Sequence, residues 1–433
     1  MALNTEVIAQ DIEYCERCRC HFCTEYCASY QVSKWLPWSA RGRMEISRYL
    51  NEGSLSFDEN VRDAIYTCQL CRRCSEHCSA VLPNDRKIDV AETMVHMRNE
   101  IVSKHPELEP DVFSEMCANM KESGAMVATT PKEKSAWVQG LDLQEGGERV
   151  FFASCMNPLM GYFAMALESA RKYKMSMKGL LKAEKGMRKL KLDKVFRSIA
   201  DTALKSNEGY VQSLRSSVKI LQKLGLEVGF LADEPCCGAA LHTYGHLDDF
   251  QAHAQKTFAV LKQQGVREII MINPICQGIM ASVYPQFVEG WDITCRHLWE
   301  VVAEKIQNRD ISLESPQERT VTFHDPCYAA RYVNQIEPPR IILNNTKNVD
   351  FIETEYNGRF TNCCGGGGAE VKYSELTTAM ATNRVKELLE TGADTIVTSC
   401  PICVVMLKLG VKESGKKAEV IDIVDFIANG LQI

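Results

Sequence analysis

The sequence predicts an α-helical domain followed by two duplicated α/β domains. Three observations lead to this prediction. Cysteines gather near the N-terminus in two short groups, and the rest of the chain holds two copies of one longer cysteine pattern. In both copies, β-rich runs alternate with helical stretches, which is typical of a mostly parallel sheet covered by helices.

The overall composition fits a globular protein of two or three domains. The chain has 433 residues, of which 45% are hydrophobic and 24% are charged, and its net charge is −6. This charge gives no reason to expect nucleic-acid binding. The N-terminal stretch has no secretory signal pattern, and no apolar run approaches the roughly 18 residues of a membrane span. We therefore expect a cytoplasmic protein, in which any contact with the inner face of a membrane is made through a partner or a surface patch.

The cysteine content is the most informative part of the composition. The chain has 20 cysteines, and it is too long for a secreted disulfide scaffold. In a reducing compartment, clustered cysteines indicate metal thiolates. Cys117 and Cys295 stand alone and are expected to be ordinary buried thiols.

The second N-terminal group has the spacing of an iron–sulfur site. The stretch TCQLCRRCSEHC places Cys68, Cys71, Cys74 and Cys78 in a C-x2-C-x2-C-x3-C run, which is typical of a cubane [4Fe–4S] cluster. Zinc is the alternative metal, but zinc sites usually use two well-separated pairs of ligands. The spacing therefore favours iron and sulfide.

The first N-terminal group, CERCRCHFCTEYC, keeps only part of this run. Cys20, Cys23 and Cys27 match its end, and Arg17 stands where the first ligand is expected, so Cys18 or Cys15 must substitute. Ala28 and Ser79 replace the proline that usually follows each run. The predicted ligand sets for two cubanes are Cys18 (or Cys15), Cys20, Cys23 and Cys78 for one, and Cys27, Cys68, Cys71 and Cys74 for the other. Helical periodicity between the groups predicts a helical, ferredoxin-like domain over residues 1–105.

The remaining cysteines form an internal repeat. The earlier copy contains Cys155, the pair Cys236 and Cys237, and Cys276; the later copy contains Cys327, the pair Cys363 and Cys364, and then Cys400 and Cys403. In both copies, 39 positions separate the second cysteine of the pair from the last cysteine, and both end in Pro-Ile-Cys. This equality indicates an ancient duplication.

Each copy shares a scaffold of short β-rich runs with helical stretches between them. The runs are RVFFAS, LEVGFLA and REIIMIN in the earlier copy, and RTVTFHD, VDFIETE and ADTIVTS in the later one. The predicted α/β domains cover residues 148–300 and 318–433, and residues 106–147 are expected to be a helical linker. Because each cysteine lies just after a run, the ligands are expected where strands end.

The copies differ in ligand number and in length. Asn273 stands where the later copy has Cys400, so the earlier copy has four candidate ligands rather than five. The earlier copy also contains a basic insertion at about 165–210. Its loose helical periodicity predicts an amphipathic helix that docks on a partner or an anionic membrane surface, with a plain solvated helix as the alternative.

These motifs resemble the CCG-domain iron–sulfur proteins, especially the D- and B-type subunits of heterodisulfide reductase. They are also similar to the iron–sulfur subunits of glycolate oxidase and anaerobic glycerol-3-phosphate dehydrogenase. The resemblance is carried by the N-terminal cysteine groups, Cys-Cys-Gly at 236–238 and 363–365, HDPC at 324–327, EPPR at 337–340 and CPIC at 400–403. It implies two Rossmann-like CCG domains.

The resemblance also implies a site and a function. Cys327, Cys363, Cys364, Cys400 and Cys403 would hold a noncubane [4Fe–4S] cluster and carry catalysis. The glycines that follow the pair would let the backbone approach the cluster and direct N–H groups at sulfur. Occupancy of the earlier site, on Cys155, Cys236, Cys237 and Cys276, stays open because of Asn273. His242 and His324 lie near the ligands, where a hydrogen-bonding core role is favoured over a proton relay or iron ligation. Arg331 is expected to form a structural salt bridge, with pairing to an anionic substrate as the alternative.

The expected function is that of an oxidoreductase subunit. Electrons would pass through the two cubanes to or from the noncubane cluster, where a disulfide would be reduced. The alternative is a non-catalytic electron-transfer subunit between a flavoprotein dehydrogenase and a quinone, membrane or ferredoxin partner. No GxGxxG fingerprint occurs, so any flavin is expected on another subunit of the complex.

Overall fold

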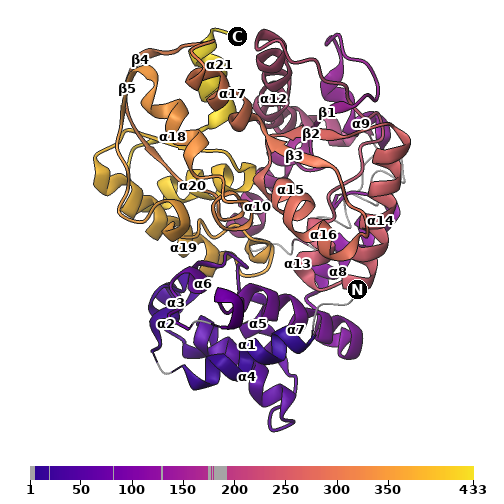
Figure 1. Cartoon of the computed structure of the whole chain (residues 1–433), viewed down its shortest axis with the longest axis vertical. Helices are drawn as coiled ribbons and strands as arrows, with labels where there is room; N and C mark the ends of the chain where they lie inside the picture. Colours follow the sequence, from indigo (N-terminus) through magenta and orange to yellow (C-terminus); the bar gives the residue numbers. More distant parts are fainter. Residues whose placement is uncertain are drawn as a thin grey trace.

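The computed structural model of the chain describes residues 5–18, 20–80, 82–127, 130–173, 177, 179 and 193–433. It contains two parallel β-sheets and a helical N-terminal region, as the sequence predicts. In Figure 1 the N-terminal helices lie below the two sheet-containing units. The charged residues Lys182, Lys185, Arg188 and Lys189 of the basic insertion lie outside the described residues, so the predicted amphipathic helix stays a prediction.

The N-terminal region consists of helices joined by short loops that carry the cysteines. Its helices are α1 (Thr5–Arg17), α2 (Phe22–Glu25), α3 (Ala28–Ser33), α4 (Ala40–Asn51), α5 (Glu59–Tyr66), α6 (Arg73–Glu76) and α7 (Val90–Lys104), with short turns η1 (Leu36–Trp38), η2 (Pro83–Asp85) and η3 (Pro106–Leu108). The longer ones begin at capping side chains: Ser39, Asp58 and Asp89 accept hydrogen bonds from backbone N–H groups of α4, α5 and α7. Helices α4 and α7 lie within residues 1–105, the region that the sequence predicts to be helical.

The segment predicted as a helical linker contains α8 (Asp111–Ser123), α9 (Pro131–Lys134) and the short turn η4 (Ala136–Val138). Helix α8 is part of the packed core, since Phe113 stacks on Tyr244 of the earlier copy with ring centroids 4.2 Å apart. The division of the chain into domains remains a prediction, because side chains pack across its proposed boundaries.

The two sheets follow the same plan. The first has the order β1-β2-β3, and the second has the order β5-β4-β6-β7, with every pair parallel. The strands are β1 (Arg149–Phe152), β2 (Glu268–Met271), β3 (Thr294–His297), β4 (Leu313–Phe323), β5 (Thr346–Phe351), β6 (Thr395–Thr398) and β7 (Glu419–Asp422). The series β1-β2-β3 therefore corresponds to β4-β6-β7, as expected of a duplication.

Helices connect and cover these strands. In the earlier copy they are η5 (Asn157–Leu159), α10 (Met160–Tyr173), α12 (Asp193–Lys223), α13 (Ala239–Tyr244), α14 (Leu247–Gln263), α15 (Pro274–Gly278), η6 (Ile279–Val283), α16 (Tyr284–Phe287) and α17 (Leu298–Gln307). In the later copy they are η7 (Tyr328–Tyr332), α18 (Glu337–Asn344), η8 (Gly358–Phe360), η9 (Ala369–Val371), α19 (Ser374–Leu388), η10 (Leu389–Thr391), α20 (Pro401–Ser414) and α21 (Ile423–Leu431). Helices α14 and α19 match the stretches predicted as helical.

One predicted strand does not form. The run LEVGFLA contributes only isolated parallel bridges, from Gly229 to Val150 and from Phe230 to Glu145, where the later copy has the strand β5. Gly229 explains the difference. A Cβ atom at this position would lie 1.9 Å from the carbonyl oxygen of Gly146, so two backbones meet too closely for a side chain. Glycine inside a strand often marks such an approach.

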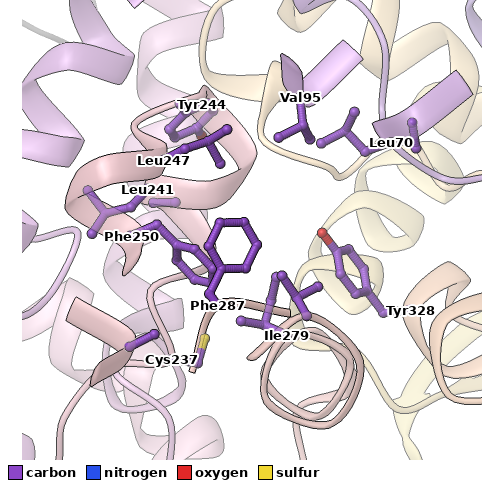
Figure 2. Close-up of a cluster of buried hydrophobic side chains, with 14 of the residues drawn as sticks. Leu70, Val95, Cys237, Leu241, Tyr244, Leu247, Phe250, Ile279, Phe287 and Tyr328 are labelled. Carbon is purple, nitrogen blue, oxygen red and sulfur yellow. The ribbon is translucent and has the colours of Figure 1, made fainter. Parts of the chain in front are cut away.

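The largest apolar cluster joins all three parts of the chain. Figure 2 shows Leu70 and Val95 from the N-terminal region facing Tyr244 and Phe250 of the earlier copy, with Tyr328 of the later copy beside them. A second cluster fills the space between the two sheets, with Trp299 and Phe323 as its large side chains. The largest cluster therefore holds the cysteine loops of the N-terminal region and the earlier copy, whereas Cys364, Cys400 and Cys403 of the later copy belong to another cluster.

Arg98 provides a test of this shared packing. Its guanidinium is buried and donates to the carbonyl oxygens of Cys68 at 2.6 Å and Thr243 at 2.7 Å, which belong to different parts of the chain. Replacing Arg98 with methionine would leave these buried oxygens unpaired, so we expect a loss of about 2–5 kcal/mol of stability. The melting temperature of the purified protein measures it.

Arg267 is the matched control, because it is an exposed arginine paired with the exposed Glu148. We expect Arg267→Met to change stability by less than about 0.5 kcal/mol. Equal melting temperatures for the two variants would contradict the role that we give to Arg98.

Candidate metal centres

The two N-terminal cysteine loops have the same local conformation. His21 and Arg72 both adopt the left-handed backbone conformation, with φ of 57° and 58°, and each precedes a one-turn helix, α2 or α6. The equivalence aligns Cys20 with Cys71 and Cys23 with Cys74, as the spacing predicts. In the same alignment, Arg17, the last residue of α1, occupies the position equivalent to Cys68.

The first loop borders a cavity with an empty volume of about 380 Å³. The thiol-bearing residues that line it are Cys15, Cys18, Cys20, Cys23, Cys74 and Cys78. Both candidates for the first ligand therefore reach the cavity. Arg41 donates to the sulfur of Cys15 at 3.4 Å, while the Cys18 and Cys20 sulfurs lie 3.2 Å apart, so the choice between Cys15 and Cys18 stays open.

A second cavity, with an empty volume of about 390 Å³, lies against the other predicted ligand set. Its cysteines are Cys27, Cys68, Cys71 and Cys74. Cys27 thus leaves its own loop and joins the second group, while Cys78 joins the first. Cys74 lines both cavities, which are therefore adjacent.

The four cysteines of the earlier copy also meet. The sulfurs of Cys155 and Cys236 lie 2.9 Å apart, and the thiol of Cys237 interacts with those of Cys236 and Cys276. Hydrogen bonds from Cys155 and Cys237 lower the pKa of Cys236 well below its usual value. Cys155 is half-buried, and a cavity of about 280 Å³ lies beside it.

The Asn273 side chain, which stands where a fifth thiol would be, is already engaged in hydrogen bonds. Its oxygen accepts a hydrogen bond from the backbone N–H of Ile275 at 3.0 Å, which caps α15, and its nitrogen donates to Ser154 at 3.3 Å. The Ser154 hydroxyl also lies 3.3 Å from the sulfur of Cys276. Glu234 stabilises this loop by accepting hydrogen bonds from the backbone N–H groups of Ala153 and Ser154, both at 2.7 Å, and burial raises its pKa to about 8.

The later copy brings its cysteines to the carboxyl ends of β4 and β6. Cys327 follows β4, Cys400 and Cys403 lie at the start of α20, and the pair enters from the loop after β5. The sulfurs of Cys364 and Cys403 lie 3.2 Å apart. Thiol hydrogen bonds from Cys363 and Cys403 lower the pKa of Cys364 to about 5. Cys327 is half-buried, and the other four are buried.

The later site also touches the N-terminal region. The thiols of Cys71 and Cys363 interact directly, and this contact together with burial raises the pKa of Cys71 well above its usual value. Charge on Cys71 also contributes to the raised pKa of Cys327. The second N-terminal ligand set and the five-cysteine set are therefore in contact.

The four glycines after Cys364 serve two purposes. The N–H groups of Gly365 and Gly366 donate to the sulfurs of Cys363 and Cys364, both at 3.4 Å, as the sequence predicts. The glycines also allow close packing, because a Cβ atom on Gly367 would lie 2.7 Å from the backbone oxygen of Gln69. On Gly368 it would lie 2.9 Å from the hydroxyl of Tyr244.

The polar residues near the thiols have different roles. His242 is a core residue, buried against Phe250 at 5.1 Å between ring centroids, and burial lowers its pKa to about 3. Arg331 does not form the expected salt bridge with any described residue; it donates to the backbone oxygens of Cys71, Arg359 and Thr361. Asp325 of HDPC pairs with Arg340 of EPPR at 2.7 Å, which joins these two motifs.

The donor sets fit iron–sulfur clusters. Thiolates are the ligands of such clusters, and the backbone N–H groups of Gly365 and Gly366 are the kind of donor that tunes them. Burial raises the pKa of several free thiols, including Cys15 to about 11, and bound metal ions would reverse this effect because they stabilise thiolates. Zinc fits the N-terminal sets less well, because zinc sites usually take their ligands as two well-separated pairs.

Sequence reasoning missed the contacts that cross the chain. Glu234, Arg384 and the Cys71–Cys363 contact were not predicted. Glu234 lies two residues before the cysteine pair, and an acidic residue beside a ligand was the only local signal for it. Cys117 is buried in the core, as expected of an isolated thiol.

Comparison with known protein families identifies the repeated domain. The CCG cysteine-rich domain matches residues 202–281 and 321–408. This chain carries two CCG domains. The later match contains all five cysteines of its copy, whereas the earlier match excludes Cys155, which precedes the basic insertion.

Curated relatives with this domain are redox proteins. The chain is 25% identical to the D-type subunit of the dihydromethanophenazine:CoB–CoM heterodisulfide reductase of Methanosarcina barkeri, over 99% of the chain and 96% of that protein. It is 21% identical to the "Probable glycolate oxidase iron-sulfur subunit" of Bacillus subtilis, over 93% of the chain and 90% of that protein. It is 24% identical to the EtfAB:quinone oxidoreductase of Syntrophomonas wolfei, over 88% of the chain and 48% of that protein. Among the described residues, no helix is long and apolar enough to cross a membrane.

Proposed function

We propose that this chain is the iron–sulfur subunit of a heterodisulfide-reductase-like oxidoreductase complex. The two N-terminal ligand sets would each hold a [4Fe–4S] cubane, and Cys327, Cys363, Cys364, Cys400 and Cys403 would hold a noncubane [4Fe–4S] cluster. The relatives support the class of protein, since one is a heterodisulfide reductase component and another is a quinone oxidoreductase.

The observation that carries the proposal is an unbroken series of thiols. Cys74 lines both N-terminal cavities, and Cys71 of the second cavity contacts Cys363 of the later CCG domain. Clusters held by these residues would be close neighbours, which suits electron transfer between them. Arg331 would stabilise added negative charge at this junction, because its buried guanidinium lies beside Cys71 and Cys327.

Two roles fit such a series. In the first, the later CCG domain reduces a disulfide with two electrons and two protons and releases two thiols. In the second, the chain only carries electrons between a flavoprotein and a quinone, membrane or ferredoxin partner. The burial of four of the five thiols and the use of Asn273 as a helix cap favour the carrier role, because a disulfide would need direct access to the site.

Metal content tests the proposal. Two cubanes and one noncubane cluster require about twelve irons and about the same amount of acid-labile sulfide in anaerobically purified protein. About sixteen irons would show that the earlier CCG domain is also occupied despite Asn273. Near-stoichiometric zinc with little iron would refute the proposal.

The two roles are then separated by a turnover assay on the complete complex. Under the carrier role, photoreduced protein should pass electrons to a quinone analogue and leave a mixed heterodisulfide unchanged. Formation of two free thiols per disulfide consumed would instead establish the reductase role.

A further inference from the structure

His324 occupies a fixed position at the later CCG site. It directly follows β4, and its backbone N–H donates to Val397 of the neighbouring strand β6 at 2.9 Å. Its carbonyl oxygen accepts from the hydroxyl of Thr398 at 3.0 Å. The side chain is 1% exposed, and one ring nitrogen lies within 4.8 Å of the sulfurs of both Cys364 and Cys403.

Arg384 determines how the imidazole is oriented. Its Nε donates to Nδ1 of His324 at 3.1 Å. The rest of the guanidinium is also engaged: it donates to the Tyr356 carbonyl and the Thr361 hydroxyl, both at 3.1 Å, and forms an ion pair with Glu387. Arg384 is itself 1% exposed, so neither side chain has room to turn.

This contact defines the tautomer of His324. An arginine has only donors, so Nδ1 must be the acceptor, and the neutral ring must then carry its proton on Nε2. Nε2 is buried and has no hydrogen-bond partner among the described residues. Nε2, the nitrogen that Arg384 does not engage, is therefore an N–H donor without an acceptor in the described part of the chain.

The same contact argues against His324 as an iron ligand. A metal-bound histidine donates its second N–H to a carboxylate, a carbonyl or water. Here the second nitrogen faces an arginine donor, so coordination through Nε2 would require an imidazolate. The arrangement fits a hydrogen bond to sulfur, in which the ring donates and the thiolates accept.

The earlier CCG domain lacks this donor. Phe152 stands three residues before Cys155, where His324 stands three residues before Cys327. Phe152 is fully buried and offers no N–H group on its side chain. The two copies therefore differ in two ways at their sites, by the loss of the fifth thiol and by the loss of the histidine.

We propose that His324 donates an Nε2–H hydrogen bond to the cluster sulfur at Cys364 and Cys403, and that Arg384 is the residue that positions it. The inference rests on the C-terminal cluster of the proposed function. Hydrogen bonds to cluster sulfur stabilise the more negative, reduced state and so raise the reduction potential. His324 thus raises the electron affinity of the C-terminal cluster.

The test is an EPR-monitored redox titration of the full-length protein. His324→Phe copies the earlier domain and removes the donor, and we expect at least a tenfold loss of electron affinity at the C-terminal cluster, equivalent to about 59 mV for one electron. His324→Gln keeps an N–H at the same distance along the side chain and should recover at least half of the shift. His246→Gln, which affects a histidine paired with Glu109, should change nothing.

A second measurement uses the wild-type protein and therefore does not require that a variant folds. Protein labelled with ¹⁵N-histidine should show a weak nitrogen coupling to the reduced C-terminal cluster in pulsed EPR, as expected across a hydrogen bond. A strong coupling, typical of a direct iron–nitrogen bond, would overturn the inference. So would the absence of any coupling, or an unchanged potential in His324→Phe with the cluster retained.

The outcomes separate this inference from the proposed function. About eight irons in the wild-type protein would mean that the C-terminal cluster itself is absent, and both would fail. About twelve irons with no effect of His324 on the potential would refute only the role of the histidine.

Discussion

Cys364→Ser is expected to remove the C-terminal cluster and to leave both N-terminal cubanes intact. The sulfur of Cys364 interacts with Cys363, Cys403 and the backbone N–H of Gly366, all of which belong to its own CCG domain. The iron content should fall from about twelve to about eight. In low-temperature EPR, the reduced protein should keep the signals of two cubanes.

Cys363→Ser is the informative partner of this variant. It should remove the same cluster, but Cys363 also contacts Cys71, so the signal of the second cubane should change as well. The difference between the two variants isolates the Cys71–Cys363 contact. Identical cubane spectra in both variants would show that this contact does not join the two sites, and loss of every cluster from folded Cys364→Ser protein would contradict the assignment of separate ligand sets.

This expectation differs from the one that the sequence alone supports. The spacing of the cysteines predicts independent ligand sets in separate domains. The structure joins them, because Cys71 and Cys363 are far apart in the chain yet touch in the fold. A contact of this kind leaves no local pattern, since it depends on how the N-terminal helices pack on the later copy.

Features with local causes were predicted well. The strands β1, β2, β4, β5 and β6 form where β-branched and aromatic runs precede the cysteines, and the parallel sheets follow from alternation with helices. The exchange of Cys27 and Cys78 between loops stays a prediction, although both residues line the cavities where it would place them.

Features that depend on tertiary packing were not predicted from the sequence. The run around Gly229 has strand-like composition, but its backbone meets Gly146 too closely to pair along its length. Arg384 lies towards the C-terminal end of α19, and in the sequence it resembles any other charged residue on a helix. Its contact with His324 becomes apparent only when α19 is packed against the end of β4.

The glycine loop gives a prediction with a similarly large effect. Gly365 has a φ of +87°, and a Cβ atom there would lie 2.4 Å from the backbone oxygen of Thr377. Alanine would combine a left-handed conformation with a backbone clash, so we expect Gly365→Ala to cost about 2–4 kcal/mol. Gly392 is the matched control, because it has a φ of +81° with no atom near the added Cβ, and Gly392→Ala should cost only about 1–2 kcal/mol.

Gly367→Ala should act on the junction between sites. Gly367 has no positive φ, but its Cβ would lie 2.7 Å from the backbone oxygen of Gln69, in the loop between Cys68 and Cys71. The clash should push this loop away from the later CCG domain and separate Cys71 from Cys363. We therefore expect full iron content, a lower melting temperature and slower electron transfer from the second cubane to the C-terminal cluster by at least tenfold.

Freeze-quenched EPR after rapid reduction measures that transfer. Gly209→Ala is the control, since Gly209 also lacks a positive φ and has no atom within 4 Å of an added Cβ. In this helical position alanine should leave the rate unchanged and raise the melting temperature slightly, because alanine favours helix more than glycine does. An unchanged rate in Gly367→Ala, with the melting temperature lowered as expected, would mean that electrons do not cross at Cys71 and Cys363.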